Sequence, residues 1–192
     1  MQPRHSQGAV FLDCSGPQFN GCRARSLFKD SPYVVCSGIC GSGYLQAKVL
    51  DKLSSIGTNL TTWVNVLGTW MSSAEMHIIH QYKAQGGKCG NDYRATTPGT
   101  SIFEGGFVFE LVDYGWWKTR LVQHGFVHTQ ISPQMASFES GTEQEVSRFA
   151  KMNLMAFQKL WNRHNPNATI AEDGIYGPET INAFNQSPCD GF

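Results

Sequence analysis

The stretch that decides the fold covers residues 95–114 and reads Ala95-Thr-Thr-Pro-Gly-Thr-Ser101-Ile-Phe103-Glu-Gly-Gly-Phe-Val-Phe-Glu110-Leu-Val-Asp-Tyr. Proline followed by glycine at positions 98 and 99 predicts a turn. The aromatic and β-branched residues at 107–112 predict a strand, and Glu110 is the one charged residue within that run. The stretch therefore predicts a turn that leads into an apolar strand with a carboxylate inside it.

Helices and strands are predicted on both sides of this stretch, and their patterns differ in period. Apolar spacing predicts a helix over 44–53, followed by a turn at 56–59. Capping-box patterns at 72–75 and 142–145 predict two more helices, the first through 81 and the second ending before Asn165-Pro166. Shorter helices are predicted at 116–123, closed by Gly125, and from Pro178 onward. Further strands are predicted at 60–67 and 126–131.

These elements interleave without the regular rhythm of a parallel sheet, so the predicted class is α+β, with a small antiparallel sheet flanked by helices. Composition divides the chain into a Cys-rich segment over 1–43, a core over 44–141 and a short helical extension over 142–192. Hydrophobic residues make up 41% of the chain and charged residues 16%, which is enough apolar material for a packed core.

Charge and hydropathy exclude two classes of partner. The chain has 15 basic and 15 acidic residues, without a long run of one sign, so we expect no nucleic-acid partner. No apolar stretch is long enough for a membrane span.

The six cysteines predict an oxidising compartment, because most of them fall in a segment rich in Gly, Ser and Pro. We expect disulfides that stabilise this N-terminal segment, without a pairing chosen among Cys14, Cys22, Cys36, Cys40, Cys89 and Cys189. A metal site at Cys36 and Cys40 ranks second, because no matching second pair or nearby histidine accompanies them.

The polar start of the chain is not a signal peptide, so we expect a mature secreted protein whose leader was removed. Asn59 and Asn167 lie in glycosylation sequons and are candidate sites. Asn185 lies in a third sequon, but Pro188 follows it and makes it a poor acceptor.

The segment Pro98-Gly99-Thr100-Ser101, with positions 103, 106 and 110, resembles the signature of zinc D,D-carboxypeptidases and related peptidoglycan peptidases. Residues 68–76 and 113–126 are similar to the segments that precede and follow this signature in the family. The resemblance covers residues 44–140 and implies the hedgehog/D,D-peptidase-like fold. It also implies a zinc ion held by residues at positions 103, 110 and a later strand.

The C-terminal part resembles a truncated peptidoglycan-binding repeat. Phe157-Gln-Lys-Leu160 is similar to one element of that repeat, and Asp173-Gly-Ile-Tyr-Gly-Pro-Glu-Thr180 is similar to another. The second of these is the most specific local match in the chain, and it implies either a binding module or a structural extension.

The chain departs from the carboxypeptidase pattern at each position that carries the chemistry. Phe103 and Glu110 occupy the first two zinc-ligand positions, and Ser137 or Met135 occupies the third. The substrate-binding arginine is replaced by Trp70 or Met71, and a glutamine by Met76. A hydrolytic zinc site needs three protein ligands with lone pairs and an open position. These departures from the family pattern therefore predict a non-catalytic protein without a cofactor.

Three functions follow from these observations as alternatives. The first is a secreted pseudoenzyme that binds a glycan or a peptidoglycan fragment in the manner of a lectin or a defence protein. Its candidate ligand surface is the former cleft, formed by Trp70, Met71, Met76, Ser101, Phe103, Glu110, Met135 and Ser137. The second is a hydrolase with a relocated metal or acid/base site, and the third is an extracellular structural protein that self-associates.

The relocated site has several candidates. His77 with His80, and His124 with His128, have spacings that suit a metal, although a core-edge role is favoured. Glu104 and Glu110 are candidate paired acids, because an even separation on a strand would place both on one face. Among the tryptophans, Trp70 is the one expected to be exposed in a cleft, and most of the others are expected in the core.

Overall fold

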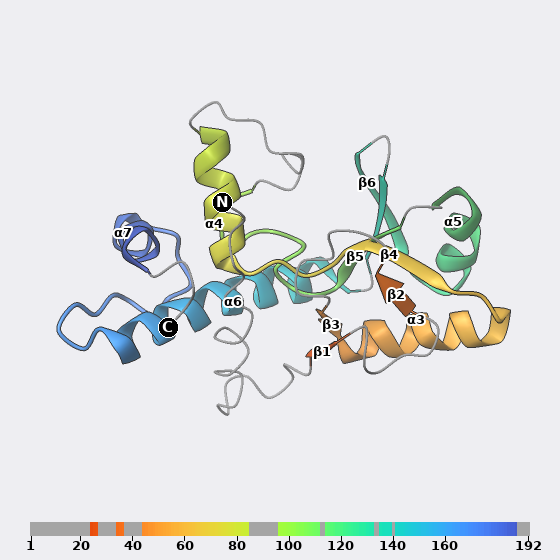
Figure 1. The fold of residues 1–192 in the computed structure, drawn as a ribbon, viewed down its shortest axis with the longest axis horizontal. Coiled ribbons are helices and arrows are strands. Elements are labelled where there is room, and N and C mark those ends of the chain that lie inside the picture. Colours follow the sequence, from red (N-terminus) through yellow and green to blue (C-terminus); the bar gives the residue numbers. More distant parts are fainter. Residues whose placement is uncertain are drawn as a thin grey trace. The chain divides into compact units, whose positions relative to one another are not determined.

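A computed structural model describes residues 24–26, 34–36, 44–84, 96–111, 114–132, 135–139 and 141–187 (Figure 1). The disulfide predictions for Cys14, Cys22, Cys40, Cys89 and Cys189 lie outside the described residues. Cys36 lies on a short strand whose side chains are not described, so its pairing also stays a prediction.

The chain divides into two compact units, each assembled from separate parts of the sequence. Among the described residues, the first unit comprises 71–84, 96–104 and 147–187. The second comprises 24–26, 34–36, 44–70, 105–111, 114–132, 135–139 and 141–146. These units interleave along the chain, whereas the three segments expected from composition follow one another.

All described strands belong to the second unit, and they form two sheets. The larger has the order β2-β4-β5-β7-β6, built from β2 (Val34–Cys36), β4 (Val64–Gly68), β5 (Val108–Leu111), β7 (Met135–Glu139) and β6 (Val127–Ser132). Strand β2 runs parallel to β4, and the other three pairs are antiparallel. The smaller sheet pairs β1 (Ala24–Ser26) with β3 (Tyr44–Gln46) in antiparallel fashion.

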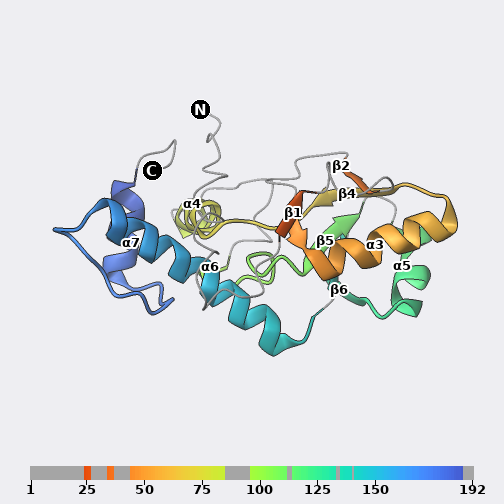
Figure 2. The same ribbon diagram turned by 90° about the horizontal axis from the view of Figure 1, so that it is seen from below.

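Helices α3 (Ala47–Leu60) and α5 (Tyr114–Gln123) pack against these strands within the second unit (Figure 2). The expected turn at 56–59 is wrong, because α3 continues to Leu60 and buries Ile56 and Gly57. Helix-interior glycine costs about 1 kcal/mol, which burial of the apolar face outweighs. The residue that caps the end of α3 is Thr61, whose φ of 50° places it in the left-handed region.

The predicted end of α5 at Gly125 is confirmed. Gly125 has a φ of 74°, and the amide of Phe126 donates to the carbonyl of Leu121 at 3.0 Å. This is the closing hydrogen bond of a Schellman motif, which glycine favours because it has no Cβ.

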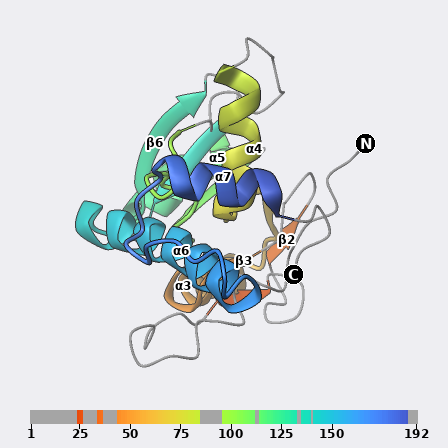
Figure 3. The ribbon, with the colours of Figure 1, turned by 90° about the vertical axis from the view of Figure 1, so that its left-hand side faces the viewer.

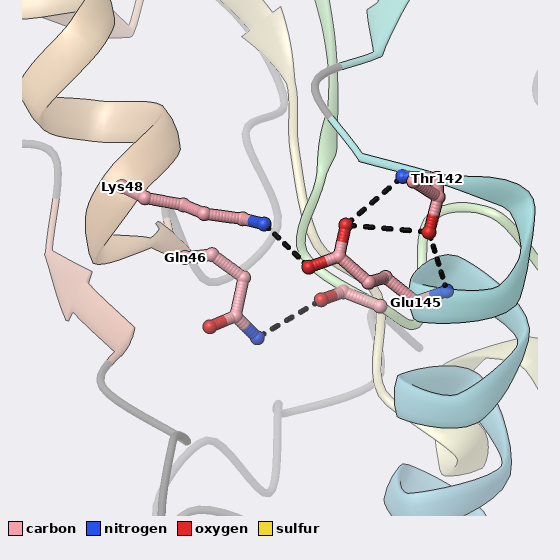
Figure 4. A network of polar contacts seen from close by, with 5 residues as sticks. Gln46, Lys48, Thr142 and Glu145 are labelled. Atoms are coloured by element: carbon pink, nitrogen blue, oxygen red, sulfur yellow. Dashed lines mark hydrogen bonds and ion pairs between the residues drawn. The ribbon is translucent and has the colours of Figure 1, made fainter.

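A network of polar contacts connects the beginning of α3 with the 141–146 segment of the second unit (Figure 4). Lys48 Nζ lies 2.7 Å from Glu145 Oε1, and the amide of Thr142 donates to the other oxygen at 3.0 Å. The backbone amide of Glu145 donates to Thr142 Oγ1 at 3.2 Å, which confirms the predicted capping box. Gln46 adds a side-chain hydrogen bond to the carbonyl of Gly105.

The first unit is helical in its described residues. Helix α4 (Ser73–Ala84) contacts α7 (Pro178–Gln186), and the main part of α6 (Glu143–His164) packs with both (Figure 3). The buried cluster consists of Leu154, Phe157, Trp161, Ala183 and Phe184. The rings of Phe157 and Phe184 stack with centroids 3.6 Å apart.

The predicted α+β class is confirmed, and most predicted helices are present with similar bounds. Residue patterns missed four short strands: β1 and β2 lie in the segment expected to be irregular, β3 was assigned to a helix, and β7 was implied only by the resemblance. No helix in the described part of the chain has the length and hydropathy that crossing a membrane requires.

Candidate functional site

The segment with the family-like signature forms a turn wrapped around the carboxylate of Glu104. The amides of Gly99 and Ser101 donate to Glu104 Oε2 at 2.8 and 3.0 Å. Ser73 Oγ, at the start of α4, donates to Oε1 at 2.6 Å. Gly99 has a φ of 83°, so a residue without Cβ suits this turn.

Burial raises the pKa of Glu104 to about 7, against the opposing effect of its hydrogen bonds from Ser73, Gly99, Ser101 and Thr100. Only 2% of the residue is exposed. Its main-chain carbonyl also accepts a hydrogen bond from Asn153 Nδ2 on α6, at 3.3 Å. The same Asn153 amide donates to the carbonyl of Met71 at 3.2 Å. Glu104 therefore links the turn to α4 and α6 within the first unit.

A sequence signal for this arrangement existed and was missed. Ser101 and Glu104 have the same Ser/Thr-x-x-Glu spacing as Ser72 with Glu75 and Thr142 with Glu145. In all three pairs, the glutamate accepts the backbone amide of the residue three positions earlier. No helix follows Glu104. Ser101 and Glu104 therefore form a hydrogen bond of the capping-box type within a buried turn.

The positions of the former cleft that the structure describes are buried. Phe103 is 1% exposed and Trp70 is 6% exposed, so the expectation of an exposed Trp70 is wrong. The other buried members are Met71, Met76, Ser101 and Glu110. The apolar residues at these positions therefore belong to the core of the unit that contains each of them.

The strand register shows which residue of β7 lies beside Glu110. Glu110 on β5 is the Cα partner of Ser137 on β7, in the antiparallel pair. Residues that face each other in such a pair are neighbours across the strands. Met135 begins β7 two residues earlier and lies opposite a different position. Ser137, and not Met135, is therefore the β7 residue directly across from Glu110.

The donor set does not fit zinc. Phe103 has no lone pair to offer, and its side chain is buried. Across the part of the chain that the structure describes, no group of three or more His, Cys, Asp or Glu side chains is suited to a metal. A zinc site needs three such ligands. No step of a zinc-dependent reaction is therefore assigned to these residues.

The proposed pairing of Glu104 with Glu110 loses its basis. Glu104 belongs to the 102–106 turn and precedes β5, so the two residues do not alternate along one strand. The even-spacing argument requires both residues on the strand, and that part of the prediction is wrong.

The two histidine pairs have different surroundings. His77 Nδ1 lies 2.6 Å from the Tyr176 hydroxyl, and Nε2 lies 3.2 Å from Asn185 Oδ1. Its ring stacks on Phe184 with centroids 4.7 Å apart. Burial is the main cause that lowers the pKa of His77, so the neutral ring is favoured. His77 is therefore placed as a packing residue between α4 and α7.

His124 and His128 also have interactions other than with each other. His124 is exposed, and its Nδ1 lies 2.8 Å from the carbonyl of Arg120. His128 stacks on Tyr114 with nearly parallel rings. The core-edge and surface roles expected for these histidines agree with this placement.

The segment that resembles a peptidoglycan-binding repeat is held together by Gln158. Its Nε2 donates to Asp173 Oδ1, the carbonyl of Ile175 and Thr180 Oγ1 at 3.0 to 3.2 Å. Its Oε1 accepts the amide of Gly174 at 2.7 Å. The residues that carry the resemblance thus form hydrogen bonds with one another. These hydrogen bonds stabilise the local fold of the extension.

The tryptophans divide into buried and exposed groups. Trp117 and Trp161 are buried like Trp70, whereas Trp63 is 52% exposed and Trp116 is 43% exposed. The guanidinium of Arg120 lies 3.6 Å from the ring centroid of Trp116, in a cation–π arrangement. Both exposed tryptophans belong to the second unit.

Comparisons with protein-family models, with curated proteins and with solved structures found no match to this chain.

Proposed function

We propose that the chain is an extracellular, non-catalytic protein on the zinc D,D-carboxypeptidase scaffold, which binds a glycan or a peptidoglycan-derived ligand. The observation that carries the proposal is the buried phenylalanine at position 103, where the resemblance places the first zinc ligand. An aromatic ring packed in the interior removes both the metal donor and the space for a water nucleophile.

The strand pairing supports the same scaffold in the second unit. In the family, the second and third ligands come from a strand and from a later strand. Glu110 and Ser137 have that relation here, as cross-strand partners. Serine at position 137 is not a residue that zinc sites use, so the scaffold proposal includes loss of the metal.

Exposed aromatic residues support the ligand-binding part of the proposal. The described members of the former cleft are buried and offer little surface to a ligand. Trp63 and Trp116 are about half exposed, and tryptophan is a residue type that interfaces favour. We therefore assign ligand contact to these two tryptophans in place of Trp70.

A pull-down with insoluble peptidoglycan and a glycan array test this assignment. We expect Trp63→Ala or Trp116→Ala to weaken binding at least about tenfold, the loss typical of an interface tryptophan. Val122→Ala is the matched control, because Val122 is exposed on the same helix as Trp116 and its substitution should leave binding unchanged. Absence of binding by the unmodified protein, or equal binding by all variants, would contradict the assignment.

A structural or assembly role is the second candidate, and the burial of the former cleft positions favours it. A protein whose former cleft residues have become core can serve as a rigid extracellular component without a small ligand. Light scattering distinguishes the two roles: concentration-dependent self-association without glycan binding supports assembly, and a monomer that binds glycan supports recognition.

A further inference from the structure

We propose that the surface of α5 around Trp116 and Arg120 binds a sugar that carries a carboxylate, as uronic acids do. The site deepens the proposed glycan binding, on which it rests, by naming the chemical class of the ligand. It is defined by a guanidinium that is held beside an exposed indole and that has no anionic partner in the described part of the chain.

The Arg120 side chain is held by two contacts to one residue. Its guanidinium carbon lies 3.6 Å from the centroid of the Trp116 ring, and its Nη1 donates to the Trp116 carbonyl at 2.6 Å. Its Nε and Nη2 groups have no acceptor among the residues that the structure describes. These two groups form a planar fork that matches the two oxygens of a carboxylate. Arg120 is therefore positioned in advance for bidentate contact with an anion.

The indole of Trp116 supplies an apolar surface beside this fork. The residue is about half exposed, and its ring packs edge-to-face with that of the buried Trp117, with centroids 4.6 Å apart. Contacts with Trp117 and Arg120 restrict the ring before binding, which lowers the entropy cost of ordering it against a ligand. The face of an aromatic ring is apolar and carries partial negative charge, so it suits the C–H groups of a sugar ring.

The surroundings of this pair are basic. Helix α5 contains Lys118 and Arg120, and no acidic residue occurs from position 114 to position 132. Lys52 of α3 places its Nζ 4.5 Å from the ring centroid of Phe126, which lies just beyond the end of α5. In the described part of the chain, no carboxylate forms an ion pair with any of these three cations. The charge of the surface therefore complements an anionic ligand.

The small number of cations favours a carboxylate-bearing sugar over a nucleic acid. Binding of a nucleic acid depends on neutralising many phosphates along a backbone, and the chain as a whole has a net charge of zero. One guanidinium fork beside one indole instead matches a single carboxylate on a sugar ring.

Binding to surface-attached oligosaccharides of matched length tests the ligand class in the full chain. The carboxylate probes are the hexasaccharides of hyaluronan and of polygalacturonate, and each is compared with the same oligosaccharide after its carboxyl groups are reduced to alcohols. We expect reduction to weaken binding at least about tenfold, because it removes a charge-assisted pair of hydrogen bonds. This comparison requires no change in the protein.

The Arg120→Ala variant shows whether the guanidinium is the group that contacts the carboxylate. We expect it to weaken binding of the acidic hexasaccharide at least about tenfold and binding of the reduced one less than about threefold, because the two changes remove the same contact. Arg148→Ala is the control: it removes an exposed arginine from α6 in the first unit and should leave both affinities unchanged. Equal weakening of both probes by Arg120→Ala would overturn the contact, since it would mean that Arg120 only supports Trp116.

Two further probes separate this site from other kinds of binding. Retention of chitohexaose or insoluble peptidoglycan without retention of either acidic hexasaccharide would leave glycan binding intact and overturn the carboxylate site. Tighter binding of a heparin hexasaccharide and of duplex DNA than of both acidic probes would also overturn it, because such a pattern reflects charge alone. Absence of binding to every glycan would remove the proposed function, and the carboxylate site with it.

Discussion

Replacing Gln158 by alanine is expected to lower the free energy of unfolding by about 3 to 4 kcal/mol. Its side chain is fully buried and holds Asp173, Gly174, Ile175 and Thr180 together. The variant leaves a cavity, and it leaves the Gly174 amide without this acceptor. An unsatisfied buried donor is costly in itself, which is why the expected loss exceeds that of an ordinary hydrogen bond.

Urea denaturation of Gln158→Ala beside Gln144→Ala measures this effect. Both residues lie on α6, but Gln144 is exposed, so its substitution should change the free energy of unfolding by less than about 0.5 kcal/mol. A loss below about 1 kcal/mol for Gln158→Ala would show that the loop does not depend on this side chain.

The second large effect is expected at Gly174, which lies at the turn that Gln158 holds. Its φ is 66°, and an added Cβ would lie 2.8 Å from the carbonyl oxygen of Lys151 and 2.5 Å from its Cγ. The left-handed conformation costs a residue with Cβ about 1 to 2 kcal/mol, and the backbone contact adds to that. We expect Gly174→Ala to destabilise the protein by about 2 to 4 kcal/mol.

Gly177→Ala is the matched control for Gly174→Ala. Gly177 lies three residues later with a φ of −92°, and among the described residues no heavy atom comes within 4 Å of an added Cβ. Its substitution should cost less than about 1 kcal/mol, the loss of a mediocre helix cap. Equal effects of the two alanines on thermal unfolding would contradict the proposed strain at Gly174.

The expected effects at Gln158 and Gly174 concern the segment that resembles a peptidoglycan-binding repeat. Asp173, Gly174 and Thr180, which carry the resemblance, each form a hydrogen bond with Gln158. Such a match is evidence about local folding, and recognition of peptidoglycan by this segment stays a proposal.

Local signals predicted those parts of the fold that depend on few neighbours. Capping boxes at Ser72 and Thr142 and the glycine closure at Gly125 are properties of short segments, and all three are confirmed. Strand β7 was missed because it contains no β-branched residue and owes its conformation to pairing with β5 and β6 on either side. The continuation of α3 past Gly57 also depends on tertiary burial, which composition does not reveal.

The sequence predicts which residue types occupy the candidate site. It does not predict that their side chains are buried. That Phe103 offers no metal ligand follows from its residue type alone. Burial of Trp70, Met71 and Met76 depends on packing by distant segments, which is why the family resemblance led to the wrong expectation of a cleft. The hydrogen bonds of Glu104 depend on a local Ser-x-x-Glu pattern, which the sequence contains. Its burial depends on tertiary packing, which the sequence does not show.

The proposed function depends on the absence of a zinc centre at positions 103, 110 and 137. Metal analysis of purified protein dialysed against zinc and then against buffer tests it most directly, because it requires no knowledge of a substrate. We expect much less than one zinc per chain, as Phe103 and Ser137 provide no usable ligands. About one zinc per chain that survives dialysis, and is lost with Glu110→Ala, would contradict the claim.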